Sequence, residues 1–229
     1  MKNIFIYISI IVIASNVLLI LSIVISKWFR KWKNRKLTRG LINYLGLSDW
    51  FFKLSDEEQA LFKLYYSQVV KTNERVDRLT EGKIYSTSEK PSQLLWMVAA
   101  NAILNNDFEF AYNLLSKAQS LCHSPWEKQQ VSIAFSFLYF KQKDLLSGAK
   151  ENCIRHCENA IGNIERYGSP EVIPTMPFDH LIAIYEESSE YQKALTVAAK
   201  AISIIGTKNR KVREMYDKKM QQLKELEIK

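Results

Sequence analysis

Three segments of the chain carry the same pattern of small residues, and this pattern restricts the fold more than any other feature. Each segment places small or medium-sized side chains four and then three positions apart, which puts them on one face of a helix. The three sets are Ala111, Leu115 and Ala118; Cys153, Cys157 and Ala160; and Ala194, Ala198 and Ala201. Their starting positions are separated by 42 and 41 residues. Such a face lets two helices approach closely, and its repetition predicts a stack of helical pairs.

The rest of the body also has helical patterning. Seven glycines in 229 residues are few, and alternating β-branched stretches are nearly absent after residue 26, so we expect an all-α fold. Ser55 and Glu58 have the spacing of a capping box, and Pro91 suits the first position of another helix. The middle repeat holds about seven extra residues, or two helical turns. Its two helices are therefore expected to be longer than those of the neighbouring repeats.

The last repeat resembles a tetratricopeptide repeat. The residues that match the family's pattern are Phe178, Leu181, Ile182, Tyr185, Tyr191, Ala194, Ala198 and Ala201. The match is imperfect, because Ile182 stands where the family usually has glycine and Ala198 where it has phenylalanine. The period near 41 also exceeds the 34 residues of the family. The resemblance implies antiparallel helix pairs whose first helices line a concave surface that binds a partner.

An almost wholly apolar run, residues 4–25, begins the chain. As a helix it would extend about 33 Å, enough to cross a hydrocarbon core of about 30 Å. A cleaved signal peptide is the alternative, but its apolar core is shorter and ends in a small-residue cleavage site. Asn16 could join two such helices, while the serines of the run could instead bond to their own backbone. We expect an uncleaved transmembrane helix at residues 1–26.

A basic segment, residues 27–39, follows this run. Residues 1–39 hold eight cations and no acid, and basic residues beside a span remain on the cytoplasmic side. This predicts a single-pass protein of the cell membrane, in keeping with a bacterial plasma membrane, with its N-terminus outside and its C-terminal domain cytoplasmic. The residues expected to contact membrane lipid are Lys27, Trp28, Arg30, Lys31, Trp32 and Lys33. Nucleic acid is not an expected partner, because residues 40–206 carry a net charge of −4.

These features divide the chain into five parts. The predicted fold class is all-α, with an N-terminal transmembrane helix followed by an α-α helical-hairpin repeat domain. The parts are the transmembrane helix 1–26, the basic juxtamembrane segment 27–39, a helical lead-in and loop 40–91, the tetratricopeptide-like repeats 92–206 and a C-terminal capping helix 207–229.

Cysteine and histidine residues are the candidates for chemistry. Cys153, His156 and Cys157 are spaced so that a metal site is permitted. However, the two cysteines occupy small-residue positions of the repeat, and a free cysteine packs as a small apolar residue. We therefore favour core packing over metal binding and expect no cofactor. His123 and His180 have no serine or cysteine arranged beside them as a nucleophile pair, and no glycine loop of the phosphate-binding type is present.

The sequence predicts a scaffold rather than an enzyme. The anchored repeat domain would bind a protein or peptide at the membrane surface, and no catalytic residue is assigned. The candidate partner contacts are Trp96, Phe135, Asp179 and Glu186. Trp96 and Phe135 would serve equally well as core residues, and Glu186 lies among acids that more often form a solvated helix face. The alternatives are an enzyme or enzyme subunit with a site assembled from scattered helix residues, and a secreted helical domain.

Overall fold

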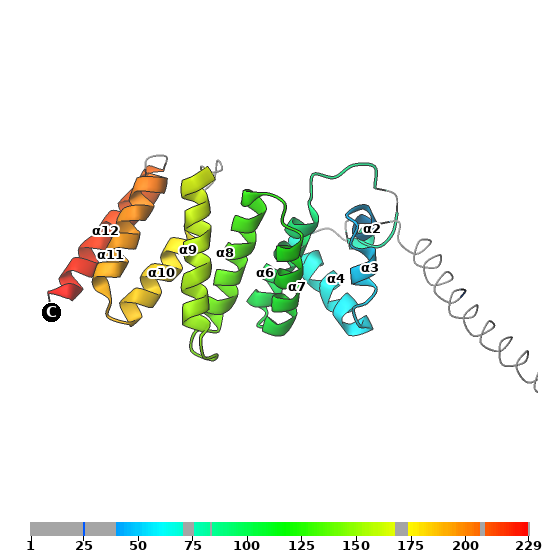
Figure 1. The fold of residues 1–229 in the computed structure, drawn as a ribbon, viewed down its shortest axis with the longest axis horizontal. Helices are drawn as coiled ribbons and strands as arrows, with labels where there is room; N and C mark the ends of the chain where they lie inside the picture. The colour runs from blue at the N-terminus through cyan, green and yellow to red at the C-terminus, as the bar shows by residue number, and fades with distance from the viewer. Residues whose placement is uncertain are drawn as a thin grey trace, which may run out of the picture. The chain divides into compact units, whose positions relative to one another are not determined.

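The computed structural model describes residues 25, 40–70, 76–82, 84–167, 174–206 and 209–228. These residues form helices and turns, with no strand among them, which confirms the all-α class (Figure 1). They belong to two compact units, namely residues 1–63 with 72–87, and residues 64–71 with 88–229.

An aromatic cluster holds the first unit together. Its short helices α2 (Leu41–Tyr44) and α3 (Ser48–Phe51) are followed by α4 (Asp56–Val70), which contributes residues up to Lys63. The ring of Phe51, which is completely buried, meets the rings of Phe52 and Phe62 edge-on, with both pairs of centroids 5.4 Å apart. Edge-to-face contacts of this kind add to the free energy gained by burying the rings.

Gly40 is packed directly against a second segment of this unit. The backbone N–H groups of Leu41 and Ile42 donate to the carbonyl oxygens of Arg78 (2.9 Å) and Leu79 (3.0 Å). A Cβ atom on Gly40 would lie only 2.5 Å from the carbonyl carbon and oxygen of Leu79. This close approach of two backbones therefore requires glycine.

The predicted capping box is confirmed at the start of α4. The Ser55 N–H donates to Oε2 of Glu58 (2.8 Å), and the Glu58 N–H donates to Oγ of Ser55 (3.1 Å). Each residue thus satisfies a backbone donor that the first turn of the helix would leave without a partner.

Among the described residues of the second unit, seven longer helices follow one another along the chain. α6 packs against α7, α8 against α9, α10 against α11, and α12 against α11. The first helices of successive pairs, α6, α8 and α10, also contact one another in that order (Figure 1). Pro91 opens α6, as predicted. The helices are α6 (Pro91–Leu104), α7 (Phe108–Ser120), α8 (Pro125–Lys141), α9 (Ala149–Tyr167), α10 (Met176–Glu187), α11 (Tyr191–Ala201) and α12 (Arg210–Glu227).

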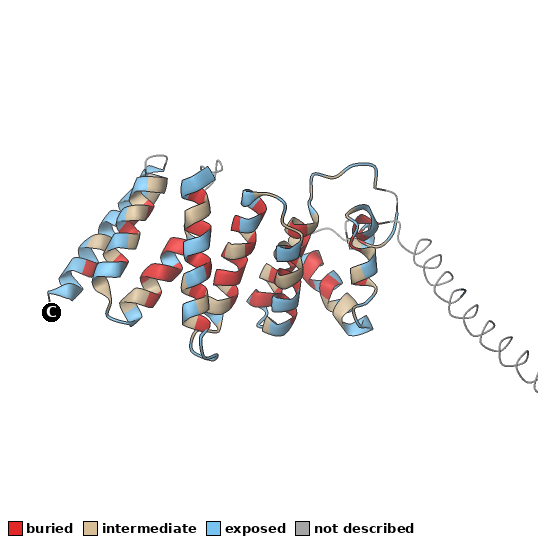
Figure 2. Cartoon of the chain, viewed as in Figure 1, coloured by how far each residue is buried: buried red, intermediate tan, exposed pale blue. Residues whose placement is uncertain are grey.

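The small-residue stripes lie in the helix interfaces. All nine residues of the three stripes, on α7, α9 and α11, are buried, and Figure 2 shows buried positions along the faces that adjacent helices share. The middle pair is the longest, because α8 and α9 have 17 and 19 residues while α6, α7, α10 and α11 have 14, 13, 12 and 11. The structure thus confirms that the three stripes lie in helix interfaces and that the helices of the middle pair are longer than those of its neighbours.

The predicted localisation needs correction. Among the helices that the structure describes, none combines the length and the apolar character needed to cross a bilayer. The single-pass topology, with an outside N-terminus and a cytoplasmic domain, is therefore withdrawn. The predicted span lies outside the described residues except for Ile25, as do Asn16 and the proposed lipid contacts Lys27, Trp28, Arg30, Lys31, Trp32 and Lys33.

Candidate functional site

A groove with a volume of about 570 Å³ lies between α10 and α12. Its floor is apolar, because Ile182 and the ring of Tyr216 are buried in it, and Met215 lies beside them with 45% of its surface exposed. Charged side chains surround this floor. The lining residues are Asp179, Ile182, Ala183, Glu186, Lys211, Glu214, Met215, Tyr216, Lys218, Lys219 and Gln222.

The carboxylates of the groove have partners within the chain. The Tyr216 hydroxyl donates to Oδ1 of Asp179 at 2.8 Å. Lys219 Nζ lies 2.8 Å and 2.7 Å from the two carboxylate oxygens of Glu186. Glu214 accepts a hydrogen bond of 2.8 Å from an arginine one turn earlier on α12. The negative charge of all three acids is therefore balanced or hydrogen-bonded before any ligand arrives.

The Tyr216 hydroxyl is fixed as a donor by its surroundings. Burial, and then the charge of the neighbouring Asp179 carboxylate, raise the pKa of this hydroxyl well above its usual range. It remains protonated at any physiological pH and holds α12 against α10 through the Asp179 contact.

Two lysines at the groove have no such partner. Lys211 and Lys218 are exposed and take part in no ion pair with any residue that the structure describes. The lining of the groove holds three lysines and three acids, and Lys211 and Lys218 are the lysines that stay outside the ion pairs of the described residues.

The sequence-predicted partner contacts fall in different places. Asp179 and Glu186 both line the groove, whereas Trp96 lies on α6 with its side chain partly exposed. Phe135 is 3% exposed, and its ring stacks on that of His156 with centroids 4.7 Å apart. The alternative role as a core residue therefore describes Phe135, whose side chain is not accessible to a partner.

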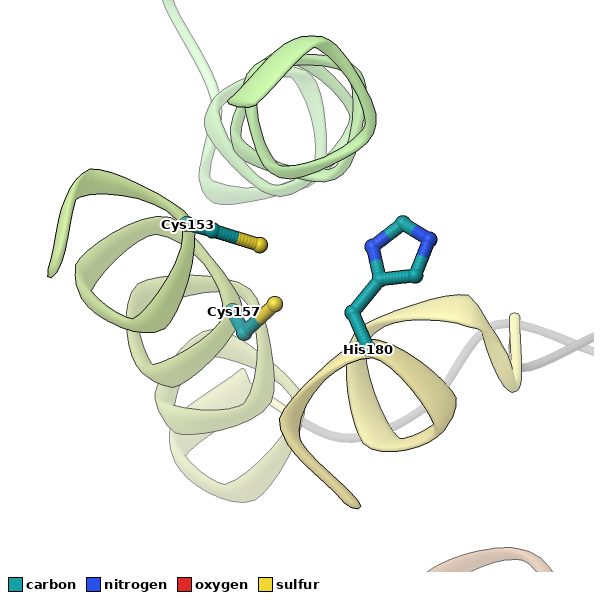
Figure 3. Close-up of side chains that lie close together, drawn as sticks. All are labelled: Cys153, Cys157 and His180. Atoms are coloured by element: carbon teal, nitrogen blue, oxygen red, sulfur yellow. The ribbon is translucent and has the colours of Figure 1, made fainter. Parts of the chain in front are cut away.

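A second group of reactive side chains lies inside the helix stack. Cys153 and Cys157 project from α9, and His180 projects from α10 toward the two sulfur atoms (Figure 3). The two Sγ atoms and a ring nitrogen of His180 all lie within 4.8 Å of one another, and all three residues are buried. Ser136 of α8 adjoins the group: its carbonyl oxygen accepts from Cys153 Sγ (3.3 Å), and its Oγ lies 3.5 Å from Nδ1 of His180.

The two thiols are not equivalent. A hydrogen bond with Cys153, followed by the contact with His180, lowers the pKa of Cys157, although burial opposes this shift. The same hydrogen bond, followed by burial, raises the pKa of Cys153. Because the two thiols interact directly, they titrate as a coupled pair.

The histidine of this group differs from the one suggested by sequence spacing. His156, which lies between the two cysteines in sequence, points elsewhere and stacks on Phe135 and on Tyr139, whose centroid is 5.7 Å away. Burial lowers the pKa of His156 to about 4, so its ring is neutral. Sequence spacing could not identify His180, because 23 residues separate it from Cys157 and only the packing of α10 on α9 brings them together.

Comparison with known proteins gives one informative match. The chain is 31% identical over 112 residues to an uncharacterized protein of Aquifex aeolicus (strain VF5). The matched region covers 46% of this chain and 54% of that protein. The chain thus spans about half the length of the relative that it matches. No family model matches the chain, and no solved structure does.

Proposed function

We propose that the chain is a non-enzymatic scaffold of tetratricopeptide-like helical pairs that binds an acidic peptide in the groove between α10 and α12. The observation that carries the proposal is the combination of an apolar floor with two lysines, Lys211 and Lys218, that form no ion pair with a residue that the structure describes. An apolar side chain of the peptide would cover Met215, which is 45% exposed, and its carboxylates would lie near the lysines. Apolar anchoring with peripheral charge complementarity is how peptide grooves combine affinity with selectivity.

The position of the groove supports this proposal. In the family that the sequence resembles, the first helices of successive pairs line the binding surface. α10 is the first helix of the last pair, and α12 follows α11 as the first helix of a further pair would. The sign of the charge also distinguishes this proposal from a site for a basic partner, because Glu186 and Asp179 are occupied by Lys219 and Tyr216.

The test is a selection of random displayed peptides on the immobilised full-length chain, followed by affinity measurement on synthetic peptides by fluorescence polarisation. We expect enrichment of peptides that contain Asp or Glu beside a large apolar residue. Reversing both charges, in Lys211→Glu/Lys218→Glu, is expected to weaken binding about tenfold at low salt, since each exposed charge contributes up to ~1 kcal/mol. Added salt should weaken wild-type binding in the same direction.

A matched control lies on the same helix. Lys224 is exposed on α12 but does not line the groove. Lys224→Glu changes the net charge by the same amount as Lys211→Glu or Lys218→Glu alone, and should leave the affinity within about twofold. Enrichment of basic peptides, or equal weakening by Lys224→Glu and by the double variant, would show that the groove does not bind as proposed.

A further inference from the structure

We propose that Cys153, Cys157 and His180 form a binding site for one thiophilic d10 metal ion, with Zn²⁺ as the ion of choice. The three side chains converge from two helices on one point, and their ligand atoms lie within 4.8 Å of one another (Figure 3). The chain has three cysteines and three histidines in all. Two of the cysteines and one histidine therefore meet in the interior. The repeat pattern requires small side chains there, but it does not require side chains that can bind a metal.

The geometry is close to that of a bound ion. Tetrahedral zinc with Zn–S of about 2.3 Å and Zn–N of about 2.0 Å separates its ligand atoms by roughly 3.5–3.8 Å. The observed limit of 4.8 Å means that the ligand atoms would approach one another by up to about 1 Å when the ion binds. Cys153 and Cys157 are four residues apart on α9, so their sulfur atoms already share one helix face.

The histidine ring is held in the orientation that a ligand needs. It stacks on the ring of Phe140 of α8, with centroids 4.1 Å apart and planes 6° apart. This contact fixes the ring plane while a ring nitrogen faces the two sulfur atoms (Figure 3). Ser136 adjoins the group, with its Oγ 3.5 Å from Nδ1 of His180, and a water molecule would complete the coordination of the ion.

The ligand set selects the class of ion. Two thiolates and a neutral imidazole suit Zn²⁺ or Cu⁺ and do not suit Mg²⁺ or Ca²⁺, which prefer oxygen ligands. Binding of Zn²⁺ would release one proton from each thiol to the solvent, and the resulting complex of one dication with two thiolates carries no net charge. A neutral complex is the form that a buried site accepts at least cost in solvation.

The fold itself does not require cysteine at positions 153 and 157. Alanine stands at the position of Cys153 in both sister helices, as Ala111 and Ala194, and at the position of Cys157 in one of them, as Ala198. A small side chain at these positions is therefore sufficient for the fold. The imidazole of His180 is buried with polar neighbours: Ser136 Oγ lies 3.5 Å from its Nδ1, and a ring nitrogen lies within 4.8 Å of both sulfur atoms.

The same comparison supplies a variant that tests the site without damaging the fold. Cys153→Ala/Cys157→Ala reproduces the alanines found at these positions in α11, so its helicity should equal that of the wild type. His180→Phe keeps a ring that can stack on Phe140 and removes the ligand nitrogen. Cys122→Ser removes the third cysteine, which lies outside the group, and serves as the control.

The experiment refolds the reduced full-length chain with excess Zn²⁺, removes free metal and determines the zinc content by elemental mass spectrometry. We expect one ion per chain for the wild type and Cys122→Ser, and none for Cys153→Ala/Cys157→Ala or His180→Phe. At free zinc of about 100 times Kd, the wild-type Tm should rise by roughly 5–10 °C and that of the alanine variant should not change. Co²⁺ in place of Zn²⁺ should give the visible bands and sulfur-to-metal charge transfer of a tetrahedral thiolate site.

Three outcomes would overturn the proposal. They are a wild-type chain without stoichiometric metal, equal metal content in the alanine variant, and a Cys153–Cys157 disulfide that forms in place of metal binding under the same conditions. The peptide groove could bind its ligand in any of these cases, because Lys211 and Lys218 are not part of the metal site.

Discussion

Neutralising Glu127 should destabilise the protein by a pH-dependent amount. This residue lies in the first turn of α8, is 6% exposed and accepts four hydrogen bonds. The donors are Lys90 Nζ (2.7 Å), Ser92 Oγ (2.8 Å), Ser124 Oγ (2.9 Å) and the His123 N–H (3.3 Å). The carboxylate thus joins the start of α6 to the start of α8, where the helix dipole also favours negative charge.

The size of the effect follows from the carboxyl pKa. Burial would raise the pKa of Glu127, but the hydrogen bonds from Lys90, Ser92, Ser124 and the His123 N–H together lower it from 4.5 to about 2. A pKa below the value in the unfolded chain means that the contribution to stability is complete above about pH 4.5 and is lost as the pH falls toward 2. At 1.36 kcal/mol per pKa unit the limit is about 3 kcal/mol, and we expect about 2–3 kcal/mol because Lys90 is half exposed.

The assay is urea unfolding of Glu127→Gln and the wild type, followed by far-UV circular dichroism. At pH 7 the variant should be less stable by about 2–3 kcal/mol, and the difference should shrink as both proteins approach about pH 3. Glu109→Gln is the control, since Glu109 lies in the first turn of α7 but is exposed. A loss that is the same at both pH values, or that Glu109→Gln matches, would refute the assignment of the effect to the buried carboxylate.

Two further predictions concern stability, each measured by urea unfolding. Gly40→Ala should destabilise the first unit by about 1–3 kcal/mol, because its Cβ would lie 2.5 Å from backbone atoms of Leu79. Gly162→Ala is the contrasting case: no atom lies within 4 Å of its Cβ, so the change should stabilise α9 by about 0.5–1 kcal/mol. Tyr216→Phe should lower the free energy of unfolding by about 1–2 kcal/mol through loss of the hydrogen bond to Asp179; no change would show that this contact does not secure α12.

The sequence revealed the features that depend on local periodicity. The spacing of Ala194, Ala198 and Ala201 identifies a helix face whatever lies opposite, so its burial could be predicted without knowing the neighbouring helix. The capping box of Ser55 and Glu58 is likewise complete within one turn. Such features need no knowledge of how distant parts of the chain meet.

Features that depend on the angle between helices could not be predicted in this way. The sequence placed His156 with Cys153 and Cys157 because it lies between them, yet residues one and three positions apart on a helix can point to different neighbours. The structure turns His156 toward Phe135 and brings His180 to the cysteines instead. Similarly, the sequence predicts Glu186 as a partner contact, and only the position of α12 shows that Lys219 already pairs with it.

The two proposed sites can be tested separately because they use different faces of α10. His180 faces α9, while Asp179 and Ile182 face the groove beside α12. Reversing the charge of Lys211 and Lys218 leaves every metal ligand in place, so zinc content should not change. Removing both thiols leaves the floor and the charges of the groove intact. If removal of the thiols weakened peptide binding while helicity stayed constant, α10 would have to move when metal is lost, because it is the element common to both sites.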